Sequence, residues 1–192
     1  MNRDYLKTLI QGTPAPIPTA FDGGCQLDLA KMADMTQWWV EQGLGTKTTA
    51  FKVASAMGQG PDLSDDEWPH LLRTVVDAAG SGATILCALK AKNTLHTIED
   101  AKKAQDLGAV GLQIDLPFFH HPDQDANVRH FTAISDAIDI GIMIYNTWWF
   151  CQNPVKEYIN ADTMSRLEDA ERVVAIKWST PQGENYDQMS LF

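Results

Sequence analysis

Residues 172–179 read RVVAIKWS, a short apolar run with a single lysine, Lys177, near its C-terminal end. Four to eight apolar, β-branched residues between polar ones are typical of a buried strand in a parallel sheet. A lysine is unusual in such a strand, because burial disfavours an ammonium group and leaves a neutral, nucleophilic amine. The same residue can instead be a lysine that has just left the strand and reaches water with its charged end. The stretch therefore predicts a strand and leaves two interpretations of its lysine open.

Similar apolar runs precede this one at regular intervals, and helical patterns separate them. The expected strands cover residues 17–21, 50–54, 84–89, 110–116, 140–145 and 172–178, and the expected helices cover residues 3–10, 28–42, 64–79, 94–107, 123–137, 161–169 and 184–192. Ser64 and Glu67 have the spacing of a capping box, which predicts where the third helix begins. Strands that alternate with helices predict βαβ units, and hence an α/β fold with a parallel sheet.

The fold that we expect from this alternation is a (β/α)8 TIM barrel. No glycine-rich phosphate-binding loop opens any of the expected helices, so a nucleotide-binding sheet is not favoured. A complete barrel takes about 250 residues, whereas this chain has 192 and reaches only the sixth strand. We therefore expect a single barrel domain over residues 1–192 that is truncated after strand six. Barrel active sites lie at the C-terminal strand ends, where the candidate residues are Lys90, Phe118, Phe119, Tyr145, Asn146 and Lys177.

The composition is that of an ordinary globular protein, with 44% hydrophobic and 21% charged residues. The formal net charge of -10 argues against nucleic acid as a partner. No apolar run is long enough to span a membrane, and residues 1–4 do not begin a signal peptide. The three cysteines, Cys25, Cys87 and Cys151, form no zinc-binding or disulfide pattern, so we expect a cytoplasmic protein.

Four stretches of the chain resemble the motifs of one enzyme family. PIPTAFDGG at residues 16–24 is similar to that family's first strand and turn, DLSDDEW at residues 62–68 to its second-helix motif, and VVAIKWS at residues 173–179 to its lysine strand. Residues 116–146, which end in the pair Tyr145-Asn146, are similar to a further segment of the family. The chain thus resembles the first six βα units of the dihydrodipicolinate synthase and N-acetylneuraminate lyase family of class I, Schiff-base aldolases.

The resemblance implies a mechanism and roles for two residues. Lys177 would attack the keto carbon of a pyruvate-type 2-oxo acid and form an imine, which serves as an electron sink when a neighbouring bond breaks or forms. Tyr145 would relay protons to the carbinolamine and to the substrate. No metal and no other cofactor is implied. We therefore expect a lyase, either an aldolase or a hydro-lyase, that acts on a small molecule.

Several positions of the expected substrate pocket depart from the family. The family's GTTGE loop, which binds the carboxylate of the 2-oxo acid, is here Ser55-Ala56-Met57-Gly58-Gln59, without the two threonine hydroxyls. The family's tyrosine pair is Phe118-Phe119, and Phe150 stands where dihydrodipicolinate synthases carry an arginine. These losses predict a different substrate specificity. The expected substrate-binding residues are Ser55, Ala56, Met57, Lys90, Phe119 and Asn146, and Lys52 or Lys90 is a candidate to replace the lost hydroxyls.

Two further interpretations stay open at this point. The lost hydroxyls and the missing strands also fit a catalytically inactive binding or structural protein that derives from a barrel. The adjacent His120 and His121, with Asp115 nearby in sequence, suggest a metal site, but they lack the i, i+4 spacing of helical ligands, so we expect no metal. A sheet that stops after six strands has two unpaired edges, and because such edges pair with other chains, we expect a homo-oligomer.

Overall fold

The computed structural model describes residues 2–148, 151–153 and 157–179, in which strands and helices alternate along the chain. The strands are β1 (Thr13–Pro16), β2 (Thr49–Val53), β3 (Thr84–Leu89), β4 (Gly111–Asp115), β5 (Gly141–Thr147) and β6 (Val173–Ser179). The α-helices are α1 (Arg3–Leu9), α2 (Leu29–Glu41), α3 (Glu67–Ala79), α4 (Thr94–Asp106), α5 (Gln124–Ala137) and α7 (Ala161–Arg166), and the 3-10 turns are η1 (Ala56–Gly58), η2 (Gly60–Asp62), η3 (Phe118–His120) and η4 (Leu167–Asp169). None of these helices is long and apolar enough to cross a membrane. The helix expected over residues 184–192 lies outside the described residues.

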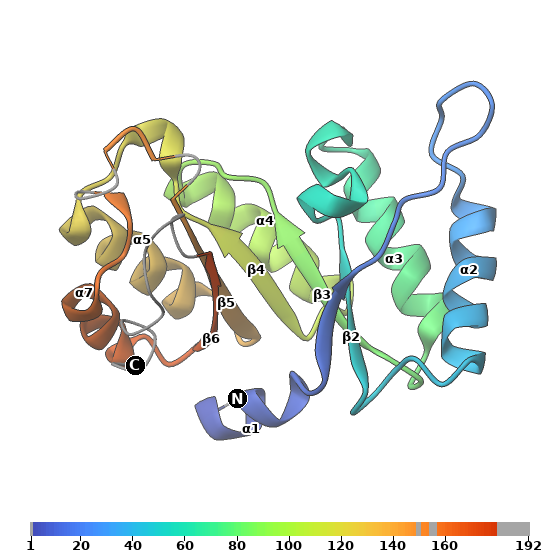
Figure 1. Ribbon diagram of the computed structural model, residues 1–192, viewed down its shortest axis with the longest axis horizontal. Helices are drawn as coiled ribbons and strands as arrows, with labels where there is room; N and C mark the ends of the chain where they lie inside the picture. The colour runs from blue at the N-terminus through green and yellow to red at the C-terminus, as the bar shows by residue number, and fades with distance from the viewer. Residues whose placement is uncertain (1, 149–150, 154–156, 180–192) are drawn as a thin grey trace.

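The described strands build half of a barrel. They form one six-stranded sheet in the order of the sequence, and every neighbouring pair is parallel. The sheet curves, with α3, α4 and α5 behind it and α1 at the N-terminal ends of the strands (Figure 1). The expected fold, a TIM barrel truncated after strand six, is therefore confirmed.

Polar caps fix where the helices begin. In the predicted capping box, the Ser64 hydroxyl accepts from the Glu67 N–H at 3.2 Å, and the Glu67 carboxylate accepts from the Ser64 N–H at 2.7 Å. Such reciprocal bonds satisfy two N–H groups that the first helical turn leaves open. The other five described α-helices each begin after a residue whose side chain accepts from the backbone N–H three residues on, namely Asn2, Asp28, Asn93, Asp123 and Asn160.

The first strand is not where the sequence pattern predicted it. We expected residues 17–21, but β1 covers Thr13–Pro16, and the later Phe21 forms only an isolated antiparallel bridge with Leu27. The two prolines of β1 argue against a strand because proline has no N–H to donate. They are tolerated because the N–H groups on either side of them, those of Thr13 and Ile17, donate to β2. The prolines therefore alternate with the donors and fall on the unpaired edge of the sheet.

Each strand presents one side to the helices and the other to the interior of the half-barrel. The outward residues belong to one large core, which includes Phe51, Val53, Cys87, Leu112, Ile114, Ile142 and Ile144. A second, smaller cluster on the inner side joins Ala50, Leu86 and Met143 to Ile10, Val110 and Ala175. Because side chains alternate along a strand, the remaining inward positions are free to carry polar groups.

The sixth strand is less buried than we expected. All seven residues of β6 are only half-buried, because β6 is an edge of the sheet and pairs with β5 alone in the described part of the chain. Beside it lies a groove of about 420 Å³ between β6, α1 and α7, lined among others by Arg3, Met164, Val174 and Ile176. Within residues 2–148, 151–153 and 157–179, the edge strand and this groove leave apolar surface uncovered.

Candidate active site

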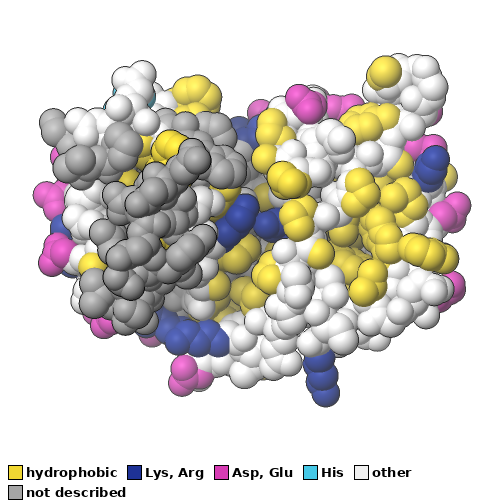
Figure 2. Space-filling view, viewed as in Figure 1, with side chains coloured by type: hydrophobic (Ala, Val, Ile, Leu, Met, Phe, Trp, Pro, Cys, Tyr) yellow, Lys and Arg dark blue, Asp and Glu magenta, His cyan; other side chains and the backbone are white. Residues whose placement is uncertain are grey.

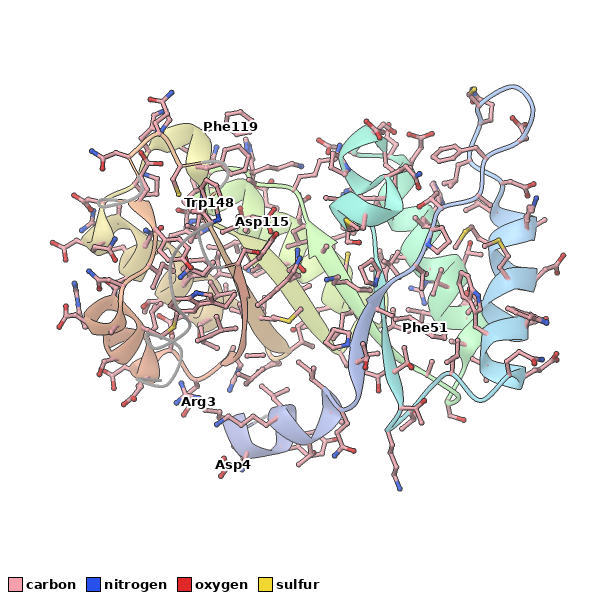
Figure 3. All side chains as sticks on the ribbon, viewed as in Figure 1. Arg3, Asp4, Phe51, Asp115, Phe119 and Trp148 are labelled. Carbon is pink, nitrogen blue, oxygen red and sulfur yellow. The ribbon has the colours of Figure 1, made fainter. Side chains whose placement is uncertain are left out.

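A set of polar side chains occupies inward positions of four strands. They are Lys52 of β2, Gln113 and Asp115 of β4, Tyr145 of β5 and Lys177 of β6, and each alternates with outward residues of the helix-covered core. Figure 2 shows Lys or Arg side chains together near the middle of the face that the curved sheet leaves open. In the same view Asp115 lies at the centre of this face, below Phe119 (Figure 3).

Lys177 and Tyr145 lie next to each other at the open end of this set. They are register partners on β6 and β5, and the Lys177 Nζ atom stands 3.5 Å from the centre of the Tyr145 ring. The Ser179 hydroxyl donates to the Tyr145 hydroxyl oxygen at 3.2 Å. The Tyr145 proton itself has no acceptor among the residues that the structure describes. The amine and an available phenol proton are therefore held together.

Lys52 and Asp115 are joined through a glutamine. The Lys52 ammonium donates to the Gln113 side-chain oxygen at 2.8 Å, and the Gln113 amide nitrogen donates to an Asp115 carboxylate oxygen at 3.3 Å. The Lys52 side chain crosses β3 to make this contact, and the β3 residue in register with Gln113 is the small Ala88. Lys52 is 2% exposed, so this charged chain lies inside the half-barrel rather than at its surface.

Burial shifts the ionisation of both charged ends of this chain. It lowers the pKa of Lys52 to about 8, an effect that the positive charge of Lys177 strengthens and the negative charge of Asp115 opposes. It also raises the pKa of Asp115 to about 6, although the Gln113 hydrogen bond and the charges of Lys177 and Lys52 pull in the other direction. Titratable groups shifted toward neutral pH by desolvation are typical of functional sites.

The loop after β2 retains one hydroxyl that has no partner. Ser55 is 3% exposed, and its Oγ atom makes no hydrogen bond within the described residues. The backbone N–H groups of Gly58 and Gly60 both donate to the Ser55 carbonyl oxygen at 2.9 Å. A side chain at Gly60 would lie 1.7 Å from the Ala54 oxygen, which explains a glycine there. The loop thus offers a substrate the Ser55 hydroxyl rather than these amides.

The other expected substrate-binding residues differ in exposure and in their partners. Ala56 is exposed, and Met57 and Phe119 are 80% and 72% exposed at the rim. Lys90 donates to the Leu63 carbonyl oxygen. Phe150 lies outside the described residues.

Asn146 has a structural partner at both ends of its amide. Its nitrogen donates to the Ile159 carbonyl oxygen at 2.9 Å, and its oxygen accepts from the Ile159 N–H at 3.1 Å. The side chain is fully buried and alternates with the inward Tyr145, so it faces the helix side of β5. This arrangement fastens the segment before α7 to the sheet and uses one N–H and the oxygen of the amide.

The histidine pair does not assemble with Asp115. The His121 ring nitrogen instead lies 3.4 Å from a carboxylate oxygen of the buried Glu157. Within residues 2–148, 151–153 and 157–179, no group of three His, Cys, Asp or Glu side chains could hold a metal ion.

Sequence reasoning did not select Gln113 and Asp115 as site residues. The signal was present in the run GLQIDL, where these two polar residues are two positions apart in an otherwise apolar strand. That spacing puts both on one face, and a polar face on a strand of a barrel must be the inner one. The single lysine in AFKVA, Lys52, follows the same rule.

A comparison with protein-family models matches residues 10–189 to the dihydrodipicolinate synthetase family. The chain belongs to this family.

Members of the dihydrodipicolinate synthetase family are longer than this chain. The 4-hydroxy-tetrahydrodipicolinate synthase of Cutibacterium acnes is 32% identical over 160 residues, which are 83% of this chain and 52% of the relative. The crystal structure of dihydrodipicolinate synthase from Aquifex aeolicus matches 94% of this chain and 58% of that one, with 26% identity and a TM-score of 0.80. The chloride-inhibited enzyme of Acinetobacter baumannii, solved in complex with pyruvate, matches 89% and 56%, with 26% identity and a TM-score of 0.78. The chain spans about half the length of the curated relatives it matches.

The half-buried carboxylate of Asp115 predicts a stabilising substitution. Asp115→Asn should raise the free energy of unfolding at pH 8 by about 1–3 kcal/mol, because the folded protein no longer pays to desolvate a carboxylate. The folded pKa of about 6 lies above the unfolded value, so the wild type loses stability as the pH rises from the unfolded pKa to the folded pKa. The gain should therefore vanish as the pH falls toward 4. Urea unfolding at both pH values measures it.

The matched control is Asp125→Asn, which alters an exposed carboxylate that pairs with Arg166 at 2.7 Å. We expect it to change stability by less than about 0.5 kcal/mol at either pH. An Asp115→Asn protein that is less stable than the wild type at pH 8 would contradict the buried-charge argument.

Proposed function

We propose that this chain is part of a lyase that forms a Schiff base with a 2-oxo acid of the pyruvate type. The observation that carries the proposal is the Lys177 amine 3.5 Å from the centre of the Tyr145 ring, inside a half-barrel of the dihydrodipicolinate synthetase family. The pyruvate complex of the Acinetobacter baumannii relative supports the choice of substrate class. Aldol cleavage, aldol condensation and loss of water all fit a common imine intermediate.

The proposed steps use the two residues in turn. The neutral Lys177 nitrogen attacks the keto carbon, and one of its protons passes to the carbonyl oxygen, which becomes the hydroxyl of a carbinolamine. Tyr145 donates its proton to that hydroxyl, which leaves as water while the carbon–nitrogen double bond forms. Ser179, which donates to the Tyr145 oxygen at 3.2 Å, stabilises the phenolate that remains. No metal enters these steps.

Two groups support recognition of the substrate carboxylate. The buried Ser55 hydroxyl lacks a partner among the described residues, and a carboxylate oxygen would satisfy it. The ammonium of Lys52, which is buried in the same half-barrel, adds a favourable charge. Both lie on or directly after β2, where the family's lost threonine hydroxyls belong.

Trapping with borohydride tests the imine. Pyruvate followed by sodium borohydride should convert the imine to a stable amine, and peptide mass spectrometry should find the added mass on the peptide that contains Lys177. Lys177→Met should abolish the adduct. Lys103→Met is the matched control, because the Lys103 amine also stands over an aromatic ring, that of Trp68 at 5.7 Å, but on the outer helix α4.

Two other results of the trapping experiment would contradict the assigned nucleophile or the proposed function. An adduct on Lys52 instead of Lys177 would show that the nucleophile is wrongly assigned. A folded protein that forms no adduct with pyruvate or with larger 2-oxo acids would contradict the proposal and favour the catalytically inactive binding protein.

The substrate specificity that we propose differs from that of the named relatives. The family's threonine hydroxyls are replaced by Ala56 and Met57, and Phe150 replaces the arginine that binds the carboxylate of aspartate semialdehyde. We therefore expect a protein that traps pyruvate but does not condense it with aspartate semialdehyde at a rate above about 1% of its reaction with its own substrate, since a pocket without the needed polar partner discriminates by 100-fold or more. A coupled assay that shows efficient condensation would refute this expectation.

We also propose that the protein is a homo-oligomer. The half-buried β6 and the groove of about 420 Å³ beside it support this proposal, because an uncovered apolar strand edge pairs readily with another chain. Light scattering on the 192-residue chain should give a mass of at least twice 21.3 kDa. A monomer that still traps pyruvate on Lys177 would show that closure of this edge is not needed for the chemistry.

A further inference from the structure

We propose that Asp115 is the base that removes and returns the proton at C3 of the 2-oxo acid once it is bound to Lys177, and that Lys52 and Gln113 position it. This inference rests on the proposed imine and adds a catalytic residue to it. It gives a function to a half-buried acid inside the half-barrel that the imine chemistry of Lys177 and Tyr145 does not use.

Register places Asp115 within reach of a substrate on Lys177. Asp115, Tyr145 and Lys177 are partners on three successive strands, so the Asp115 and Lys177 Cα atoms lie ~10 Å apart. The Lys177 side chain already reaches over the Tyr145 ring, which belongs to the strand between them. An imine on its nitrogen extends two further carbon atoms, C2 and C3. Directed along the same line, C3 approaches the carboxylate on β4.

The support of Asp115 has the form that a positioned base requires. Its carboxylate accepts from the Gln113 amide, and the other end of that amide accepts from the Lys52 ammonium. Gln113 and Lys52 are 4% and 2% exposed, so neither side chain is free to turn toward solvent. One carboxylate oxygen is thereby fixed, and the second, which is the atom that would take the proton, makes no hydrogen bond within the described part of the chain.

The charges around Asp115 suit an acid–base role near neutral pH. The charged and titratable groups that face it are Lys52 on β2, Tyr145 on β5 and Lys177 on β6, with the neutral Gln113 on its own strand. Burial outweighs the two lysine charges and leaves its pKa at about 6. A base of this strength is ionised at pH 7 and can still give its proton back.

The step balances without any other reactant. In the protonated imine, the C3–H bond breaks, its electron pair forms a double bond between C3 and C2, and the electron pair of the C2–N double bond moves to the Lys177 nitrogen. The proton goes to the Asp115 carboxylate. The resulting enamine takes back a proton, or attacks an electrophilic carbon, at C3. The rim gives no substitute, because Phe118 and Phe119 have no hydroxyl there.

Exchange of the pyruvate methyl protons in D2O tests this step separately from imine formation. In proton NMR, the wild-type protein should exchange the methyl protons with solvent deuterium. Asp115→Asn should lower the exchange rate by at least about 100-fold, while borohydride still traps pyruvate on Lys177. Asp115→Glu should restore exchange to at least about 10-fold above the Asn variant. The control is Asp100→Asn, which alters a buried carboxylate paired with Lys92 outside the half-barrel and should leave exchange unchanged.

The outcomes separate this inference from the proposed function. If the wild type neither traps nor exchanges pyruvate, the proposed function fails, and the inference with it. If it traps without exchange, or if Asp115→Asn exchanges at the wild-type rate, the imine stands and the role of Asp115 is overturned. Exchange that is lost only in Tyr145→Phe would assign the base to the phenol.

The pH profile of exchange tests the positioning role of Lys52. Exchange in the wild type should fall on the acid side with a midpoint near the Asp115 pKa of about 6. Lys52→Met removes a positive charge that lowers this pKa, so its midpoint should move to higher pH. A merely structural role of Lys52 would lower the amount of folded protein and leave the midpoint in place, and an unmoved or lowered midpoint would overturn the positioning role.

Discussion

The parallel strands bury their outer side chains beneath helices, and this single constraint directs every second residue into the half-barrel. The outward Phe51, Val53, Leu112 and Ile114 pack in the main core. Because side chains alternate along a strand, the residues between them face inward. Where an inward residue is apolar it adds to the small inner cluster. Where it is polar it cannot reach bulk water on the helix side, so it must find a partner inside. The candidate site consists of the inward positions at which the chain carries a polar side chain despite the free-energy penalty of removing it from water.

This desolvation penalty acts on the hydrogen-bonded series Lys52, Gln113 and Asp115. Lys52 is buried and Asp115 is half-buried, and the amide between them makes one hydrogen bond with each. Burial still dominates, because it lowers the pKa of the lysine and raises that of the acid. A protein that needed only stability would fill these positions with apolar side chains of similar volume. Proton transfer near neutral pH instead requires groups whose pKa values lie near neutral pH, and burying such groups lowers the stability of the protein.

The edge strand β6 links the proposed oligomer to the proposed reactivity of Lys177. Lys177 lies on this strand, which pairs only with β5 in the described residues and is half-buried along its length. An edge open to water would let water compete for the amine and screen its neighbours, whereas Lys52, on β2 next to the other edge strand, is almost fully enclosed. A second chain over the groove at β6 would exclude that water, and this links the proposed oligomer to the proposed reactivity.

Sequence alone determined the elements whose signals are local. Strand and helix periodicity located five of the six strands, the capping box located the start of α3, and one βα spacing made Tyr145 and Lys177 neighbours, since consecutive parallel strands pair in register. It misplaced β1, because two prolines argue against a strand except at the edge of a sheet, and the sequence does not show which strand is the edge. Only the tertiary structure decided that Asn146 binds Ile159, that Lys90 binds a loop carbonyl, and that Lys52 meets Gln113 across β3. These contacts join residues distant in sequence, and their geometry depends on sheet curvature and side-chain reach, which no local pattern encodes.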